Sequence, residues 1–112
     1  MNFSIQQEES YVYFKVLNRK LDAELAPDLK SELTYTVGKG EINIMVDLSA
    51  CEACDSSGMS ILTFANRLCR EADGQFVVCG LSGRVKEMAD MAGLDAVLLT
   101  ADSKAEAEKL FR

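Results

Sequence analysis

The 112-residue chain contains no histidine, a single proline and no long apolar run. Without histidine, the sequence excludes His-based catalytic triads, facial metal triads and zinc sites that need an imidazole ligand. No stretch approaches the roughly 18 consecutive apolar residues that indicate a membrane span. The first nine residues, MNFSIQQEE, lack the basic and apolar regions of a signal peptide, so we expect a cytoplasmic protein without membrane insertion.

Basic residues are also scarce, with 12 Lys and Arg against 18 Asp and Glu, which gives a formal net charge of −6. An acidic chain without a basic run is a poor ligand for nucleic acid or for an anionic membrane. Its 48% hydrophobic and 27% charged residues are typical of a globular protein. Length and composition together predict one domain that covers residues 1–112.

Four cysteines occur, and Cys51 and Cys54 have the CxxC spacing of some redox and zinc sites. A redox site would need this pair at the start of a helix, whereas here it lies in the predicted turn before one. A zinc site would have to recruit Cys69 and Cys79, which lie within a predicted helix and a predicted strand. We therefore expect four reduced thiols that pack as small apolar residues, with no bound zinc and no other cofactor.

Hydrophobic periodicity predicts strands and helices in alternation along the chain. Residues 11–16 place Val12, Phe14 and Val16 on one side of a strand. Residues 75–79 form the continuous apolar run of a strand that is covered on both faces. The predicted strands are 2–6, 11–16, 41–48, 75–79 and 96–99, and the predicted helices are 25–37, 57–72, 85–92 and 102–111.

The order β-β-α-β-α-β-α-β-α predicts an α/β domain with a mixed, mostly parallel sheet and four helices. In the third helix, Val85, Met88, Ala89 and Ala92 are expected to face inward. The predicted core comprises Ile44, Val46, Ile61, Leu62, Phe64, Leu68, Val77, Val78 and Met88.

Polar residues gather after the third predicted strand, in the sequence Asp55-Ser56-Ser57-Gly58. In open α/β sheets, function gathers at the carboxyl ends of strands. These residue types are also those that helix starts prefer, so a purely structural N-cap remains an alternative. A serine hydrolase is not expected because the chain lacks histidine, a GxSxG motif and a lysine at SxxK spacing here. Without a Walker A or GxGxxG motif either, the chain is not expected to be an enzyme.

Ser56 has a second possible role, because a serine between a loop and a helix is open to modification by another enzyme. Phosphorylation would add about 1.5 to 2 negative charges at this point. The helix N-terminus tolerates an anion, whereas the adjacent Asp55 repels one. A docking surface centred on Ser56 would therefore respond to a single phosphate.

Several motifs occur in an order that is similar to one known family. They are Leu21-Asp22, Asp47-Leu48-Ser49, the DSSGM sequence at residues 55–59, Gly74 before a strand, and residues 85–95. Taken together, they resemble the STAS family across nearly the whole chain. This family comprises the single domains of anti-sigma factor antagonists, and it also supplies the cytoplasmic tails of sulfate transporters.

The resemblance implies a partner-switching module rather than an enzyme. In that family, the unphosphorylated antagonist binds an anti-sigma factor that is also a serine protein kinase, and so frees a sigma factor. The kinase phosphorylates the first serine of the motif, and a PP2C-type phosphatase resets it. The resemblance makes Ser56 the phosphoacceptor. It also implies a partner-binding set of Asp22, Asp55, Ser56, Ser57 and Gly58.

Three positions depart from the family pattern without touching the acceptor: Arg19 where glycine is frequent, Cys54 where a larger apolar residue is frequent, and Gly83 where proline is frequent. They leave the identity of the partner open. One alternative is a STAS subunit of a larger assembly, such as a phospholipid-transport ABC complex or a stress-signalling complex, without a phospho-switch. Another is a small ligand or nucleotide bound at the helix N-terminus over residues 55–58.

Overall fold

A computed structural model of the chain describes residues 2–111; residues 1 and 112, the ends of the predicted domain, lie outside the described part. At its centre is a five-stranded sheet in the order β1-β2-β4-β6-β7. Strand β1 is antiparallel to β2, and all other neighbours are parallel. The mixed, mostly parallel sheet is therefore confirmed. The strands are β1 (Phe3–Gln7), β2 (Val12–Val16), β4 (Ile44–Asp47), β6 (Phe76–Cys79) and β7 (Leu99–Ala101).

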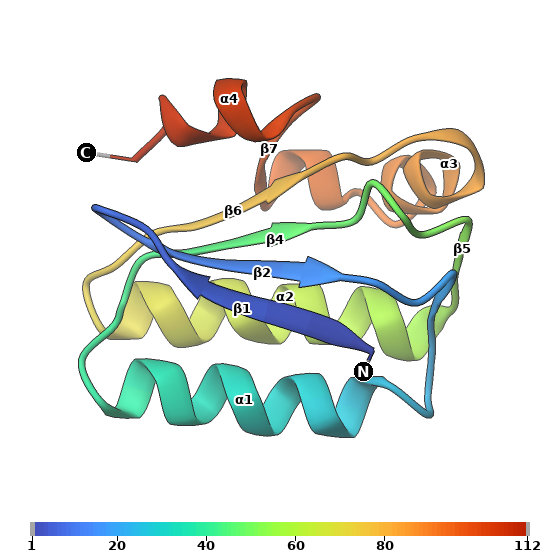
Figure 1. The fold of residues 1–112 in the computed structure, drawn as a ribbon. Helices are drawn as coiled ribbons and strands as arrows, with labels where there is room; N and C mark the ends of the chain where they lie inside the picture. The colour runs from blue at the N-terminus through green and yellow to red at the C-terminus, as the bar shows by residue number, and fades with distance from the viewer. Residues whose placement is uncertain (1, 112) are drawn as a thin grey trace.

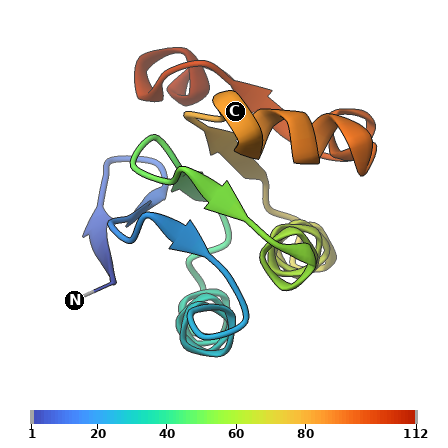
Figure 2. The same cartoon turned by 90° about the vertical axis from the view of Figure 1, so that its right-hand side faces the viewer.

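Within residues 2–111, four helices surround this sheet, as the sequence predicts. Helices α1 and α2 lie side by side beneath one face of the sheet, and α4 lies above the other (Figure 1). Seen from the right-hand side of that view, α1 and α2 are almost end-on (Figure 2). Helix α3 packs against the short helix η1 and against β5 (Ala53–Cys54), a short strand outside this sheet. Their bounds are α1 (Ala26–Gly38), α2 (Ser56–Glu71), α3 (Gly83–Met91), η1 (Leu94–Ala96) and α4 (Lys104–Glu108).

The central strands are buried on both faces, because successive side chains point to opposite sides of a sheet. In β4, Ile44 and Val46 enter the large core beneath the sheet, whereas Met45 enters a smaller core on the opposite face. Strand β6 repeats this division, with Phe76 and Val78 in the large core. The smaller core consists of Tyr11, Met45, Val77, Cys79 and Ala107, with Tyr13, Ala101, Leu110 and Phe111 packed against it.

The predicted core is correct for the sheet and for the inner stripe of α2, and wrong for α3. Met88 is 37% exposed, because only Val85 and Ala89, four residues apart, face inward from this nine-residue helix. Ala92, also predicted to face inward, is exposed as the C-cap residue. Two predicted core residues of α2, Phe64 and Leu68, are only partly buried at the margin of the apolar stripe.

Two short strands were not predicted. Strands β3 (Lys20–Leu21) and β5 (Ala53–Cys54) pair in parallel as a separate two-stranded sheet. Both fall in segments that the sequence indicates as loops, since two residues are too few to show an alternating pattern. Their pairing ties the segment before α1 to the segment before α2.

The predicted strand at 96–99 is partly wrong. Gly93 adopts a left-handed conformation with φ 73°, and a helical turn follows, in which the Leu98 N–H donates to the Leu94 carbonyl at 2.7 Å. Leu94 and Leu98 are both buried, so this segment follows helical rather than alternating spacing. The strand β7 therefore begins only at Leu99.

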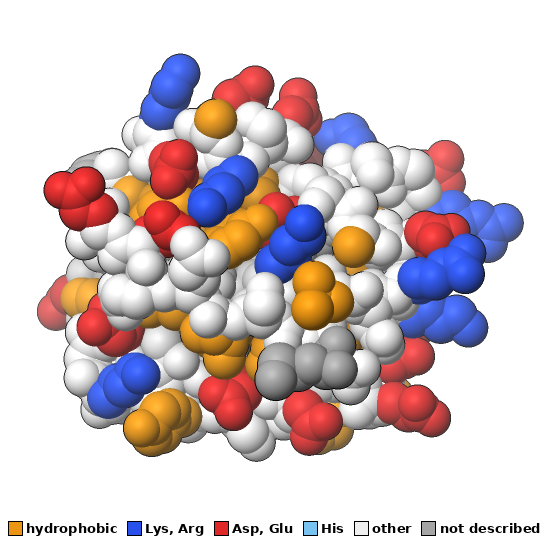
Figure 3. All heavy atoms as spheres, in the orientation of Figure 1, with side chains coloured by type: hydrophobic (Ala, Val, Ile, Leu, Met, Phe, Trp, Pro, Cys, Tyr) orange, Lys and Arg blue, Asp and Glu red, His pale blue; other side chains and the backbone are white. Residues whose placement is uncertain are grey.

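Helix α4 covers the smaller core by a few specific contacts. The Phe111 ring, just after the helix, stacks on Tyr11 with centroids 4.8 Å apart and planes at 7°. The Tyr11 hydroxyl donates to the Glu108 carboxylate, and Lys104 Nζ lies 3.3 Å from Glu8 Oε1. Burial and then Glu108 raise the pKa of Tyr11, which keeps its hydroxyl protonated as a donor. Figure 3 shows hydrophobic side chains below α4 with charged ones beside them.

Candidate functional site

The site centres on the start of α2, whose first turn is capped by Asp55. This residue has an extended backbone (φ −100°, ψ −174°), and its Oδ1 accepts the Gly58 N–H at 2.9 Å. The carboxylate thus satisfies one of the unpaired N–H groups of the helix N-terminus, and its charge suits the helix dipole. Because Asp55 is the N-cap, α2 begins at Ser56, one residue earlier than predicted.

The two serines of the motif occupy different environments. Ser56, the first helical residue, is exposed, so its hydroxyl is open to another protein. Ser57 is half-buried and borders a groove between α1 and α2. The predicted acceptor is therefore the more accessible of the two hydroxyl groups.

Asp22 lies beside Asp55 because the short strands β3 and β5 end together. Leu21 pairs with Cys54 in this small sheet, and the Asp55 N–H donates to the Leu21 carbonyl at 3.2 Å. The Asp22 carboxylate accepts the Glu24 N–H at 3.1 Å and so holds the turn into α1. Both aspartates border one cleft of about 510 Å³, whose other lining residues are Asn18, Arg19, Lys20, Ala23 and Glu24.

Gly58 allows α2 to approach this small sheet closely. A Cβ atom at this position would lie 2.3 Å from the Leu21 carbonyl oxygen and 2.5 Å from Cys54 Sγ. Only a residue without a side chain fits, so Gly58 fixes the distance between α2 and β3. The positions of Ser56 and Asp22 relative to each other depend on this contact.

Asp47, at the end of β4, holds the loop that leads towards the site. It is 6% exposed; its Oδ1 accepts the Ser49 N–H at 2.8 Å, and its Oδ2 accepts the Tyr13 hydroxyl. Burial raises the pKa of Asp47, but the hydrogen bonds from Tyr13 and Ser49 outweigh it, so the net pKa lies below the usual value. The first part of the Asp47-Leu48-Ser49 motif therefore has a structural role.

Replacing Asp47 with Asn is expected to destabilise the fold by about 1–2 kcal/mol at neutral pH, because both hydrogen bonds lose their charged acceptor. A lowered pKa in the folded state adds stability above the unfolded pKa of about 3.9, and this is lost as the pH falls through the folded pKa. The difference in the free energy of unfolding between wild type and Asp47→Asn should therefore be smaller at acidic pH. Urea unfolding at neutral pH and near pH 3 measures it.

The matched control for this experiment is Asp90→Asn, which removes an exposed carboxylate that accepts no hydrogen bond from any residue in the range 2–111. We expect this variant to unfold like the wild type at neutral pH. If Asp47→Asn lowers the free energy of unfolding at neutral pH no more than Asp90→Asn does, the structural role of Asp47 is contradicted.

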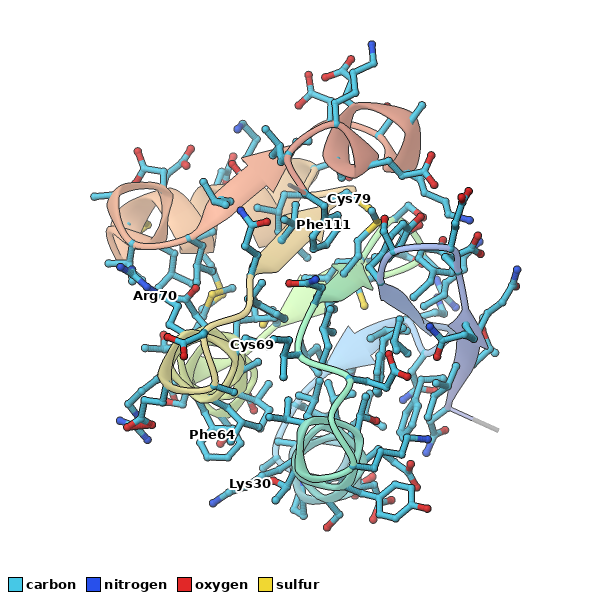
Figure 4. All side chains as sticks on the ribbon, turned by 90° about the vertical axis from the view of Figure 1, so that its left-hand side faces the viewer. Lys30, Phe64, Cys69, Arg70, Cys79 and Phe111 are labelled. Carbon is cyan, nitrogen blue, oxygen red and sulfur yellow. The ribbon has the colours of Figure 1, made fainter. Side chains whose placement is uncertain are left out.

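A groove of about 440 Å³ runs between the first turns of α1 and α2, next to the cleft. The Phe64 ring forms part of its wall, with Lys30 Nζ 4.9 Å and the Arg67 guanidinium carbon 5.8 Å from the ring centroid. Figure 4 shows Lys30 and Phe64 together at the outer side of these helices. The sequence indicated Phe64 only as a core residue; its neighbours Lys30 and Arg67 come from the structure.

The family model of the STAS domain matches residues 3–107. The chain belongs to the STAS family. This confirms the family that the sequence motifs resemble. Among curated relatives, this STAS domain is 28% identical over 87 residues to BtrV of Bordetella bronchiseptica, a candidate anti-sigma factor antagonist. The match covers 78% of this chain and 75% of the relative.

Two solved structures share the fold of this STAS domain. A candidate anti-sigma factor antagonist from Thermotoga maritima has a TM-score of 0.87 at 20% identity, over 98% of this chain and 94% of that one. The Bacillus cell fate determinant SpoIIAA, solved in its phosphorylated form, has a TM-score of 0.74 at 16% identity, over 96% of both chains. At these identities the likeness establishes the fold.

The four cysteines of the STAS domain are free thiols, and each is at most 5% exposed. Cys54, two residues before α2, and Cys69, near the C-terminal end of α2, lie roughly 20 Å apart by the helical rise, so they cannot share one metal ion. Cys69 packs beneath the sheet and Cys79 on its opposite face (Figure 4). Within residues 2–111, no cluster of three or more metal-ligating side chains is present. The sulfurs act as parts of the two cores.

Native protein is expected to leave all four thiols unreactive towards Ellman's reagent near neutral pH. Burial raises the pKa of Cys51 to about 11 and that of Cys69 to about 12, and only the thiolate attacks. All four should react in guanidinium chloride. A thiol that reacts within seconds in native protein would contradict this, and stoichiometric zinc in protein purified without chelator would contradict the expected absence of a metal.

Across residues 2–111, no helix combines the length and the apolar character that crossing a membrane requires.

Proposed function

We propose that this chain is an anti-sigma factor antagonist whose binding is switched off by phosphorylation of Ser56. In this proposal the whole chain, residues 1–112, acts as one STAS domain in the cytoplasm. It binds an anti-sigma factor that is also a serine protein kinase, and a PP2C-type phosphatase restores the unmodified state. The chain itself catalyses no reaction.

The observation that carries the proposal is the placement of Ser56. It is exposed at the first position of α2, directly after a capping carboxylate, at the end of the molecule where Asp22 also lies. A kinase could reach this hydroxyl without unfolding the helix. The names of the relatives support the proposal, as does the neighbour that was solved in a phosphorylated form.

The charge around Ser56 explains how one phosphate would act. Asp55 adjoins the serine, and Asp22 and Glu24 border the same cleft as Asp55. A phosphate would bring this surface about 1.5 to 2 further negative charges. A partner that fits the unmodified surface would then meet strong repulsion, whereas α2 would stay intact because its N-terminus favours an anion.

Affinity capture tests the proposal. Tagged wild-type protein is incubated with lysate of the source cells, captured partners are identified by mass spectrometry, and the complex is then given ATP. We expect an anti-sigma factor with a kinase domain in the complex, and one added phosphate on the Ser56 peptide. If transporter or stress-complex subunits are captured instead, and Ser56 stays unmodified after ATP is added, this chain is a permanent subunit of such an assembly.

The capping geometry argues against the other alternative, which is a small ligand or nucleotide bound at the N-terminus of α2. The Asp55 carboxylate already accepts the Gly58 N–H, and its negative charge lies where a phosphate group would have to bind. A protein partner therefore fits this end of α2 better than a free anion.

A further inference from the structure

A second cleft, of about 580 Å³, lies at the opposite end of α2 from Ser56. The end of α2, the start of β6 and the segment before β7 form its walls. Its volume is in the range of small-molecule sites. Ser56 and Arg70 are separated by roughly 20 Å along the helix, so the two sites are distinct. The lining residues are Asn43, Asn66, Arg70, Asp73, Gly74, Gln75, Phe76, Val97 and Leu99.

Asn66 is the unexpected residue in this cleft. It lies on the inner stripe of α2 between Leu62 and Cys69, and it is only 8% exposed. Its side-chain amide bonds to none of residues 2–111, although every fully enclosed side-chain nitrogen or oxygen in that range has a partner. The amide must therefore face the open cleft. A nearly buried amide without a protein partner is costly unless another molecule satisfies it.

Two opposite charges border the same cleft. Arg70 extends from the end of α2 towards the β7 side in Figure 4. Asp73 follows the helix with φ 66°, a left-handed position that usually favours glycine. Neither Arg70 nor Asp73 forms an ion pair with a described residue. The ion pairs within residues 2–111 are Arg19–Glu52 and Lys104–Glu8. The cleft thus offers a free cation, a free anion and an amide.

The remaining wall is apolar and open. Val97 is 49% exposed and Leu99 is 45% exposed, and the buried Phe76 closes the wall behind them. Aliphatic side chains left in solvent beside charged groups suit an amphipathic ligand with a short hydrocarbon part.

We infer that this cleft binds a free α-amino acid with an aliphatic side chain. Arg70 takes the carboxylate, because guanidinium and carboxylate form paired, charge-assisted hydrogen bonds. Asp73 takes the ammonium group, aided by the carbonyl groups at the negative end of α2. The Asn66 amide bonds to either polar group, and Val97 and Leu99 pack against the hydrocarbon.

The inference is tested by titrating ¹⁵N-labelled protein with L-leucine and following backbone amide shifts. We expect saturable shifts at residues 74–76 and 97–99, and none at residues 55–58. The same titration with 4-methylpentanoate, which lacks the ammonium group, and with 3-methylbutylamine, which lacks the carboxylate, should give binding weaker by about tenfold.

Substitutions test which residue binds each charged group of leucine. Arg70→Gln and Asp73→Asn, both at exposed positions, are each expected to weaken leucine binding by about tenfold, and Asn66→Leu to abolish it. Arg67→Gln is the matched control, since Arg67 lies over Phe64 outside the cleft. Absence of saturable shifts in wild-type protein, or equal binding of leucine and 4-methylpentanoate, would overturn the inference. Ser56→Asp should bind leucine normally, so this test stands apart from that of the phospho-switch.

Discussion

Ser56→Asp is expected to weaken binding of the anti-sigma partner by about tenfold or more, a loss of roughly 1.4 kcal/mol or greater. The new carboxylate joins Asp55 and Asp22 on the surface that is proposed to meet the partner, and like charges at an interface repel. The fold should be unaffected, because an acidic residue in the first turn suits the helix dipole. Calorimetry with the captured partner measures the affinity, and thermal unfolding checks the fold.

Two further variants separate this effect from a general change in charge. Ser56→Ala removes the hydroxyl without adding charge, so it should bind normally and no longer accept phosphate. Ser31→Asp adds the same charge at an exposed position of α1 and should leave binding unchanged. If Ser56→Ala is still phosphorylated, the acceptor is a neighbour, with Ser57 examined first. Equal binding by Ser56→Asp and wild type would rule out a phospho-switch at this surface.

Gly58→Ala should destabilise the protein by about 2–3 kcal/mol, which lowers Tm by roughly 8–20 °C. The added methyl group would lie 2.3 Å from the Leu21 carbonyl oxygen, a backbone atom that β3 holds in place. Helix α2 can accommodate the methyl only by moving its first turn outward. We therefore expect reduced partner binding as well as reduced stability, measured by urea unfolding and by calorimetry.

Gly38→Ala provides the matched control for this substitution. Gly38 also lies in a helix, at the end of α1, and a Cβ there would meet nothing within 4 Å. Alanine is the better helix former at both positions, so Gly38→Ala should be neutral or slightly stabilising. If the two variants are equally stable, the contact between Gly58 and Leu21 does not constrain α2.

The mixed sheet and the succession of its central strands along the chain could be predicted because these strands carry strong patterns. Val12, Phe14 and Val16 alternate with residues that point to the opposite face of the sheet, and β6 is a continuous apolar run between turn residues. Helix α2 has 16 residues, and its apolar stripe is long enough to indicate a helix from the sequence. Helix α3 has only nine residues, so its pattern could not show that Met88 points outward.

The sequence indicates where the candidate residues lie along the chain, but not how the fold brings them together. Asp55 and Ser56 stand at a recognisable helix start, so their neighbourhood follows from the sequence. The proximity of Asp22 came from the family resemblance, because it depends on a pairing of two-residue strands that no periodicity indicates. Asn66 gave no signal either, since a lone polar residue in an apolar stripe does not show whether it faces a core or a cleft.

The contact of Gly58 with Leu21 also bears on how such a sequence diverges during evolution. Ser56 and Gly58 are two residues apart, yet the proposed function needs the hydroxyl of the first, whereas the packing of α2 needs the missing side chain of the second. A lineage that lost the kinase would be free to replace the serine, whereas the glycine would stay as long as α2 rests on β3. We expect descendants that have lost phosphorylation to keep Asp55, which caps α2, and Gly58, which packs against β3, and to vary at Ser56.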